Sequence, residues 1–431
     1  MGYRELLRTQ PAFRKLWLGQ IVSELGDWLQ LIALLALFPT RGAGATHLAG
    51  IFIVRMLPSI VWAPVAGVVA DRFPRGRVMV ACDLGRALVV LGYLLIRGPE
   101  DVLWIYALMF AQETLSCFFE PARAAALPQV VPPHALLAAN SLSGATWSAM
   151  LAIGAALGGV IAAGLGPRAA FLADAASYLV SAIIIGSIGV PRLVRDAASA
   201  AAHARDRFGL FALREGLGYL RAHRAQASAA LVKCLWGMSG GIVFLFSIYA
   251  GERFTATGHD TSSTTGLLFA GRGLGALAGP LVARRFIGES AASLRRAIQV
   301  ALPIAALSIV AFSFAPTALL GALCLVFVHA GGSTCWVNSS QLLQLTVPNP
   351  LQGRVFAVEI AAFTFTTALS NAFAGAALGR GALDLRGVTL AMAGAAALST
   401  LAWWFAMRRV GARLDAAAAE HGRVPIDHPL P

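Results

Sequence analysis

The sequence predicts an all-α membrane protein with twelve transmembrane helices, arranged as two repeated bundles of six. Three observations lead to this fold class. The chain of 431 residues is 58% hydrophobic and only 13% charged, whereas a soluble domain is about 25% charged. Its apolar residues form long runs, and a run of about 20 residues is enough to cross a bilayer as a helix. The longest polar interruption, residues 191–227, leaves six runs on each side.

The runs are expected to be helices because backbone groups that face lipid must form their hydrogen bonds within the segment. The predicted spans are 13–38, 46–70, 78–97, 101–120, 138–164, 168–190, 228–250, 262–286, 295–315, 317–340, 355–379 and 387–408. The first span follows a basic N-terminus, as a signal peptide would. However, Glu24 and Asp27 interrupt it and no small-residue cleavage site follows, so we expect it to remain as a helix.

Basic residues are distributed unevenly among the connectors between these spans. If the N-terminus is cytoplasmic, most of the 34 Lys and Arg residues fall in cytoplasmic connectors, as the positive-inside rule requires. We therefore expect a multi-pass protein of the inner (plasma) membrane with both termini in the cytoplasm. A net charge of +13 would suggest a nucleic-acid partner in a soluble protein. Here the basic residues indicate topology and contact with membrane lipid, so we expect no nucleic-acid partner.

The two sets of spans resemble copies of one another. Several residues recur at one constant offset between the halves: Gly50 and Gly266, Pro64 and Pro280, Val131-Pro132 and Val347-Pro348, and Gly159 and Gly375. Parallel duplication of a six-helix unit places a substrate path between the copies. The predicted organisation is a first bundle at 1–190, a linker at 191–227, a second bundle at 228–410 and a cytoplasmic tail at 411–431.

Within the linker, residues 206–225 have the pattern of a basic amphipathic helix. Leucines recur on one helical face and arginines on another: Leu210, Leu213, Leu217 and Leu220, and Arg207, Arg214 and Arg221. Such a helix is suited to the inner leaflet, where its arginines contact anionic lipid; a recognition or regulatory role is the alternative. The tail after Arg413 is rich in alanine and then has prolines, so we expect it to be poorly ordered.

The connector between the second and third spans, residues 67–77, is short and strongly charged. It combines a glycine for close helix approach with charges that stay at the water interface. It resembles motif A of the major facilitator superfamily, Gly-x-x-x-Asp-Arg-x-Gly-Arg-Lys/Arg, with Pro74 in place of the second glycine and Gly76 in place of the following basic residue. The resemblance implies a cytoplasmic gate that holds the halves together in the outward-facing state, formed by Gly67, Asp71, Arg72, Arg75 and Arg77. The alternative is an ordinary positive-inside loop.

More specific motifs lie after the fourth and tenth spans and within the sixth. They are Phe119-Glu120-Pro121-Ala122-Arg123, Gly353-Arg354-Val355-Phe356 and Phe171-Leu172-Ala173-Asp174. Together they resemble the branch of bacterial major facilitator exporters that includes macrolide efflux proteins and the enterobactin exporter. The resemblance implies the major facilitator fold and export of a small molecule by alternating access. Antiport rests on the resemblance alone, because Gln112 and Glu113 stand where drug antiporters have the arginine of motif B.

Charged residues inside the spans are the best candidates for chemistry, because lipid makes them costly. Burial raises the pKa of a carboxyl group and a nearby arginine lowers it, so a carboxylate held between these effects can load and release a proton. The alternative is a fixed ion pair. The predicted residues of proton coupling or of the substrate pathway are Glu24, Asp27, Arg55, Glu113, Arg272 and Glu359. Asp27 is the first choice because it lies mid-span and Glu24 shares its helical face. Glu359 is expected near the membrane interface.

Other residues in the spans have structural interpretations. Asp83 and Arg86 are three residues apart and are expected to form an ion pair. His329 is expected to be a core histidine with its hydrogen bonds satisfied. The small-residue stripe of Gly271, Gly275 and Gly279 is suited to tight helix contacts or to sliding of the two halves.

These features predict a secondary active transporter: a proton-coupled exporter of a hydrophobic small molecule such as a drug, a macrolide or a siderophore-like compound, acting as a monomer. The first alternative is a lipid or lysophospholipid flippase of the same fold, with Arg55 and Arg272 binding headgroups. The second is a receptor or scaffold that does not transport. A membrane enzyme is disfavoured because the sequence lacks a His-rich metal set, a Gly-x-Ser-x-Gly motif and a P-loop. We expect no cofactor and no metal.

Overall fold

The computed structural model describes residues 2–38, 43–189, 210–254, 260–287 and 290–421, and these residues form helices and connectors with no strand. The helices before the linker are α1 (Tyr3–Thr9), α2 (Pro11–Leu35), α3 (Ala43–Arg72), α4 (Arg75–Gly92), η1 (Tyr93–Leu95), η2 (Pro99–Asp101), α5 (Val102–Val130), η3 (Pro133–Ala135), α6 (Leu136–Leu165) and α7 (Pro167–Gly186). Those from the linker onward are α9 (Leu210–Ala222), α10 (Arg224–Gly237), α11 (Ile242–Tyr249), η4 (Ala250–Phe254), α12 (Thr261–Ile287), α13 (Ala291–Phe314), α14 (Ala318–Thr346), α15 (Asn349–Gly379) and α16 (Leu385–His421).

The helix α2 carries several polar side chains along its length. Eleven described segments are long and apolar enough to cross a membrane, and α2 is not among them although it has 25 residues. The reason is its set of polar side chains, Gln20, Glu24, Asp27 and Gln30. Gln20 and Gln30 are buried inside the protein, so α2 presents these groups to the interior of its bundle. With α2 counted, the described chain has the twelve spans that the sequence predicts.

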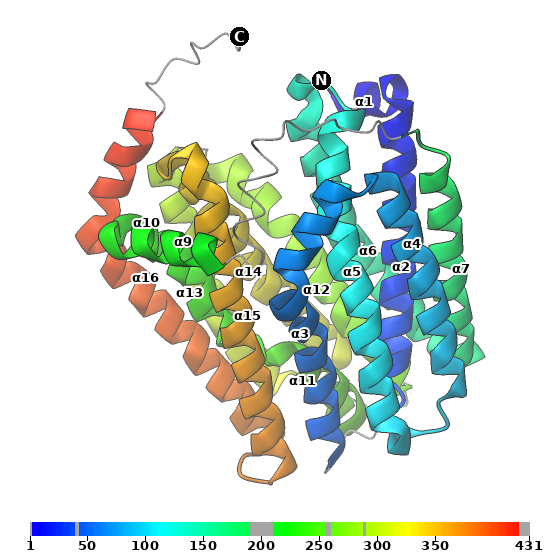
Figure 1. Ribbon diagram of the computed structural model, residues 1–431. Helices are drawn as coiled ribbons and strands as arrows, with labels where there is room; N and C mark the ends of the chain where they lie inside the picture. The colour runs from blue at the N-terminus through cyan, green and yellow to red at the C-terminus, as the bar shows by residue number, and fades with distance from the viewer. Residues whose placement is uncertain (1, 39–42, 190–209, 255–259, 288–289, 422–431) are drawn as a thin grey trace.

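Both ends of the described chain lie at the same end of the bundle, which we call the termini side (Figure 1). On this side each half has an apolar core of its own. Met79 and Phe119 belong to the core of the first half, and Leu294 and Trp403 belong to that of the second. On the opposite side a single core joins residues of both halves, with Leu48, Phe246 and Ala374 among its members. The apolar packing therefore joins the halves on one side and separates them on the other.

Small residues make the close contacts between the halves. In the pair α6 and α12, a Cβ atom added to Gly159 would lie 2.7 Å from the carbonyl oxygen of Ser262 and 3.1 Å from the Cα atom of Gly266. In the pair α3 and α15, a Cβ atom added to Gly375 would lie 2.5 Å from that of Ala49. Thr46, in the first turn of α3, donates its hydroxyl proton to the carbonyl oxygen of Gly375 at 3.3 Å.

On the termini side the same helices are farther from the other half. A Cβ atom added to Gly67 of α3, Gly144 of α6 or Gly353 of α15 would meet no atom of the described structure within 4 Å. The halves thus converge on the side opposite the termini and diverge toward the termini. By contrast, the stripe of Gly271, Gly275 and Gly279 does not face the first half. Cβ atoms there would lie 2.1 to 2.4 Å from carbonyl oxygens of α14, so this stripe packs the second half internally.

The seventh span is broken in the middle, whereas the sequence predicts one helix over 228–250. The break separates α10 from α11, and its glycines let α15 approach closely. A Cβ atom at Gly240 would lie 2.7 Å from the side chain of Thr367. The hydroxyl group of Ser370 satisfies the freed backbone groups, because it accepts from the N–H of Gly241 at 3.0 Å and donates to the carbonyl of Met238 at 2.7 Å. A broken helix inside a membrane needs such internal partners.

Two segments predicted as loop or tail are helical. The helix α5 continues through Pro121 and Pro128 to Val130, although its span was predicted to end at 120. The helix α16 continues to His421, past the predicted start of the tail. Asp415 of this extension accepts a hydrogen bond from the Nε atom of Arg295 on α13 at 3.0 Å, which holds it against the bundle.

The linker helix α9 packs against α15. Leu220 is buried there, and a Cβ atom at Gly216 would lie 2.4 Å from the carbonyl oxygen of Arg354. Glu215 also forms an ion pair with Arg354. Part of the predicted lipid-facing helix therefore contacts protein. Residues 190–209 of the linker and 422–431 of the tail lie outside the described residues, and the predicted domain boundaries stay predictions.

Candidate functional site

A polar cavity of about 140 Å³ lies within the first half. It is bounded by side chains of α2, α3, α4, α5 and α6, among which charged and amide groups dominate: Glu24, Asp27, Gln30, Leu31, Arg55, Arg86, Met109, Gln112, Glu113, Ser116, Glu120 and Trp147. Four of the six residues predicted for proton coupling or the substrate pathway, Glu24, Asp27, Arg55 and Glu113, thus line one cavity. The other two, Arg272 and Glu359, belong to the second half.

Arg55 and Glu113 form an ion pair across this cavity. The Nε atom of Arg55 on α3 donates to the Oε1 atom of Glu113 on α5 at 2.7 Å, and the two side chains are 31% and 22% exposed. The pair neutralises both charges while remaining in contact with the cavity. This geometry favours the fixed ion pair for Glu113, which was the alternative interpretation of that residue.

Asp27 is bound by a hydroxyl group instead of a cation. Tyr178 of α7 donates its hydroxyl proton to the carboxylate of Asp27, and the tyrosine oxygen accepts from the amide of Gln112 at 3.1 Å. Gln112 also exchanges hydrogen bonds with Gln30 at 3.1 and 3.2 Å. No Lys or Arg of the described chain lies within ion-pair distance of Asp27. The chain of donors ties α2, α5 and α7 together around one carboxylate.

Glu24 lies one turn before Asp27 on the same helix. Its Oε1 atom accepts from the amide of Gln20 at 2.8 Å, and Gln20 also donates to the carbonyl of Ser143 at 3.0 Å. Its Oε2 atom is buried without a hydrogen-bond partner among the residues that the structure describes. Within those residues Glu24, like Asp27, has no cation at ion-pair distance.

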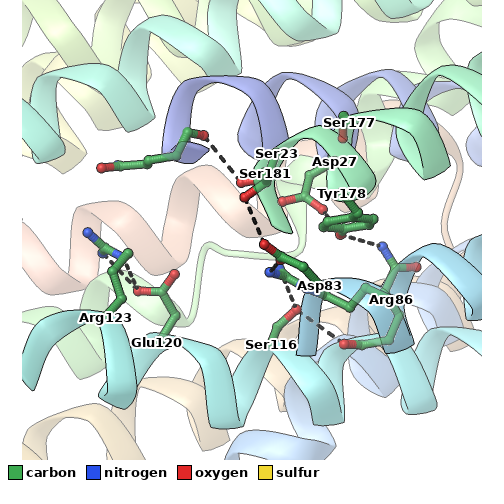
Figure 2. A network of polar contacts seen from close by, with 12 residues as sticks. Ser23, Asp27, Asp83, Arg86, Ser116, Glu120, Arg123, Ser177, Tyr178 and Ser181 are labelled. Atoms are coloured by element: carbon green, nitrogen blue, oxygen red, sulfur yellow. Dashed lines mark hydrogen bonds and ion pairs between the residues drawn. The ribbon is translucent and has the colours of Figure 1, made fainter. Parts of the chain in front are cut away.

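The predicted pair of Asp83 and Arg86 on α4 is present and buried (Figure 2). Ser181 of α7 donates to the second carboxylate oxygen of Asp83 at 2.7 Å. The guanidinium carbon of Arg86 lies 4.4 Å from the ring centroid of Tyr178, the residue that donates to Asp27. Arg86 therefore contributes positive charge to the neighbourhood of Asp27 through the face of the tyrosine ring, although Asp83 is its direct partner.

A buried carboxylate that the site prediction missed lies beside this network. Asp174 of α7 is fully buried, and one of its oxygens has no hydrogen-bond partner in the described structure. Gly26 makes room for it, because a Cβ atom there would lie 2.4 Å from the Oδ1 atom of Asp174. The sequence does contain a signal for this residue, because Asp174 is a charged residue inside a predicted span and part of the family motif Phe171-Leu172-Ala173-Asp174.

Glu359 lies about three turns into α15 and is 1% exposed. Its expected position near the membrane interface stays a prediction. Its carboxylate is 3.0 Å from the Nζ atom of Lys233 on α10. Lys233 also donates to the hydroxyl of Ser340 at 2.6 Å and lies 4.4 Å from the ring centroid of Trp336. The lysine supplies a counter-charge to the buried carboxylate, and this geometry favours a fixed ion pair for Glu359, which was the alternative interpretation of that residue.

Arg272 has neither an ion pair nor a hydrogen bond within the described chain. Its guanidinium carbon lies 5.9 Å from the ring centroids of Trp28 on α2 and of Phe269 on α12.

His329 of α14 was expected to have its hydrogen bonds satisfied, and this was wrong. Its Nε2 atom is buried without a partner in the described structure, and its ring packs against that of Phe246 with ring centroids 6.0 Å apart.

The predicted gate motif lies on the termini side, where the halves diverge. Arg75 donates to the carbonyl of Ala125 on α5 at 2.6 Å, which is a contact within the first half. Arg77 lines a cavity of about 580 Å³ between α4 and α7. The side chain of Asp71 lies outside the described residues. The gate assignment of these residues, with Gly67 and Arg72, remains a prediction.

Comparison with known proteins identifies a family whose model matches most of this chain. The model of the family described as "Major Facilitator Superfamily" matches residues 16–358. The MFS-type transporter YfiS of Bacillus subtilis is 30% identical over 54% of this chain and 54% of its own. The putative bacilysin exporter BacE of B. subtilis is 24% identical over 85% and 88%. Macrolide efflux protein A of Streptococcus pyogenes is 23% identical over 47% and 53%, so the chain spans about half the length of YfiS and of macrolide efflux protein A.

Solved structures support the fold. A bacterial homologue of the iron transporter ferroportin in its inward-facing state superposes with a TM-score of 0.68 at 15% identity, covering 93% of this chain and all of that one. At that level of identity the similarity shows the fold alone. The relatives and structural neighbours are transporters and not enzymes. The predicted fold class is confirmed, and so is the resemblance to major facilitator exporters, because the relatives include an exporter and a macrolide efflux protein.

Proposed function

Because this chain belongs to the Major Facilitator Superfamily, we propose that it is a proton-coupled exporter of a hydrophobic small molecule. Two relatives are described as an exporter and an efflux protein, which supports the direction of transport. The superfamily fold places the substrate path between two six-helix halves that rock against each other. The observation that carries the proposal is the set of carboxylates without cationic partners in the first half.

The uneven distribution of Lys and Arg supports a cytoplasmic termini side. The halves meet on the other side, through the contact of Gly159 with Gly266 and that of Gly375 with Ala49. With this orientation the structure is an inward-facing state that is closed toward the periplasm. Substrate enters from the cytoplasm or the inner leaflet, and rocking then opens the periplasmic side.

The acids of the spans divide into two groups. Asp83, Glu113 and Glu359 each have a basic side chain at ion-pair distance, so their charge is already balanced. Glu24, Asp27 and Asp174 have none among the described residues, and the first two of these line the cavity. An unbalanced charge at that depth costs a few kcal/mol, and packing alone does not explain its presence. Asp27 is therefore the proposed site of proton loading, and Glu24 tunes it by like-charge repulsion.

The neighbour of Asp27 in the chain links it to the movement of the halves. Trp28 packs against Phe269 of the second half, with ring centroids 6.3 Å apart. A rocking motion must change this contact and, through the backbone of α2, the environment of Asp27. Protonation of Asp27 and closure of the halves thus bias each other, which is what coupled transport requires.

The proposal is tested by transport into inside-out vesicles with a panel of dyes, antibiotics and siderophores. We expect at least one compound to accumulate when the vesicle lumen is acidic and to leak out after a protonophore collapses the gradient. Equal uptake with and without the pH gradient would show facilitated export and contradict proton coupling. Vesicles without the protein are the control.

A further inference from the structure

We propose that Arg272 binds an anionic group of the transported molecule, a carboxylate or a phosphate, while the exposed ring of Trp147, which adjoins Trp28, packs against its apolar part. This inference rests on the proposed transport function, because it names the chemistry of the substrate at the boundary between the halves. Four observations support it: the missing partner of Arg272, the direction in which it points, its aromatic neighbours and the open nitrogen of His329.

The first observation is that Arg272 differs from the other basic residues placed mid-span. Arg55 pairs with Glu113, Arg86 with Asp83, and Lys233 with Glu359. For Arg272, by contrast, no acid of the described chain lies within ion-pair distance. A guanidinium group inside a span is costly unless a partner or water compensates it. The three compensated residues show how this protein treats a structural charge, and Arg272 does not follow that pattern.

The second observation is the direction of the side chain. Leu267, Leu274 and Leu281 of α12 recur every seven residues and are 37%, 54% and 61% exposed, so they mark the lipid-facing side. Successive residues of an α-helix are about 100° apart, which places Arg272 about 160° from the middle of that stripe. Gly273 faces α6 and Gly271 faces α14. Arg272 therefore points to the protein interior between these two helices, and not to lipid.

The third observation is the aromatic surroundings. Trp28 belongs to the first half and Phe269 to the second, and the guanidinium carbon of Arg272 lies 5.9 Å from each ring centroid. Trp28 in turn lies 6.1 Å from the ring of Trp147, which is 43% exposed and lines the polar cavity of the first half. Trp147 thus offers exposed aromatic surface at the cavity, which suits the apolar part of a ligand, and the buried rings of Trp28 and Phe269 connect it to Arg272.

The fourth observation is His329. Its Nε2 atom is buried and has no partner in the described structure. Its ring packs against Phe246 with ring centroids 6.0 Å apart, and the centroid of Phe246 lies 5.2 Å from that of Phe269, an aromatic neighbour of Arg272. We therefore include the open nitrogen of His329 as a second polar group of the proposed site.

The charge distribution then fixes the orientation of the ligand. An anion is repelled by Glu24 and Asp27 in the first half and attracted by Arg272 in the second. The planar guanidinium group binds carboxylate and phosphate through two parallel hydrogen bonds, which an ammonium group does not reproduce. A substrate that binds Arg272 of the second half and the aromatic rings of the first half bridges the two halves.

The test measures equilibrium binding to the purified full-length protein, without a pH gradient. The probes are 1-naphthaleneacetate and 4-phenylbutyrate, each compared with its primary amide, in nanodiscs of phosphatidylcholine. We expect each acid to bind at least about tenfold more tightly than its amide, the scale of one charge-assisted interaction. Arg272→Gln should abolish this preference, and Arg272→Lys should retain part of it. Arg386→Gln, which changes an arginine at the start of α16, is the control and should bind as the wild type does.

Equal behaviour of acid and amide in the wild type, including no response to either, contradicts the proposal, as does an unchanged preference in Arg272→Gln. Nanodiscs with phosphatidylglycerol identify the source of the anion. Competition with the acids supports a lipid headgroup, and the absence of competition supports a soluble substrate. Asp27→Asn should keep the preference for acids. If that variant retains pH-driven transport, the coupling proposal fails while the anion site stands.

Discussion

The two halves of this protein share a fold but use buried charge differently. In the second half, Lys233 and Glu359 form a closed pair at 3.0 Å, with both side chains almost completely buried. In the first half, Asp27 and Glu24 line a cavity and are bound by Tyr178 and Gln20 without a cation among the described residues. Small residues recur at a constant offset in the two halves, whereas the buried carboxylates and their partners differ between them.

The largest effect on stability is expected from Lys233→Met. Removing the lysine leaves Glu359 as an uncompensated charge inside the second half, which costs about 3–5 kcal/mol. Thermal unfolding of the purified protein should show a lower midpoint. The double variant Lys233→Met with Glu359→Leu should recover most of the loss, because two apolar side chains replace the pair. A single variant as stable as the wild type would show that this pair is not structural and would remove the contrast between the halves.

A smaller effect is expected where the halves touch. Gly159→Ala places a methyl group 2.7 Å from the carbonyl of Ser262, which should cost about 1–3 kcal/mol and weaken closure on the side opposite the termini. Spin-label distances across α6 and α12 should lengthen on that side. Gly144→Ala is the matched control, since it lies on the same helix and its methyl group would meet no described atom within 4 Å. Equal distances in both variants would mean that this contact does not determine closure.

A comparable or smaller effect is expected from Asp71→Asn. Asp71 is the only acid in the run of Arg72, Arg75 and Arg77, and the family resemblance gives this motif a role in holding the outward-facing state. Neutralising it should shift the balance between states by about 1–3 kcal/mol, the usual scale of a coupling energy, and slow transport with little loss of folded protein. Transport at the wild-type rate would reduce the motif to a topology signal.

The spans and the family were predictable from the sequence, because apolar length and connector charge are local properties. The partners of the buried charges were not. Arg55 pairs with Glu113, and Lys233 pairs with Glu359, although the partners lie on different helices far apart in the sequence. The helical repeat relates residues of one helix only, so it cannot predict such pairs. The charges themselves were visible, and what had to be learned from the structure was which of them are balanced. The structure shows basic partners for Glu113 and Glu359, which were predicted as coupling candidates, and it shows that Asp174 is a buried carboxylate beside the site.

The same limit applies to the helix boundaries. Pro121 and Pro128 favour a loop on local grounds, yet α5 passes through both. In a membrane protein neighbouring helices re-satisfy the backbone groups that proline frees. The break between α10 and α11 has the converse origin. Gly240 and Gly241 lie within an apolar run that predicts a continuous helix, and the close approach of α15 with Ser370 decides the outcome.

The sharpest test of the difference between the halves is pH-driven export by Asp27→Asn in inside-out vesicles, with substrate binding measured separately on the purified protein. We expect this variant to lose uphill export, to keep substrate binding and to exchange substrate downhill, while Glu24→Gln has a milder defect. Full pH-driven export by Asp27→Asn would contradict a coupling role for this carboxylate. Asp27 would then have no role in coupling, and Glu24, the other cavity carboxylate without a cation among the described residues, would become the next candidate.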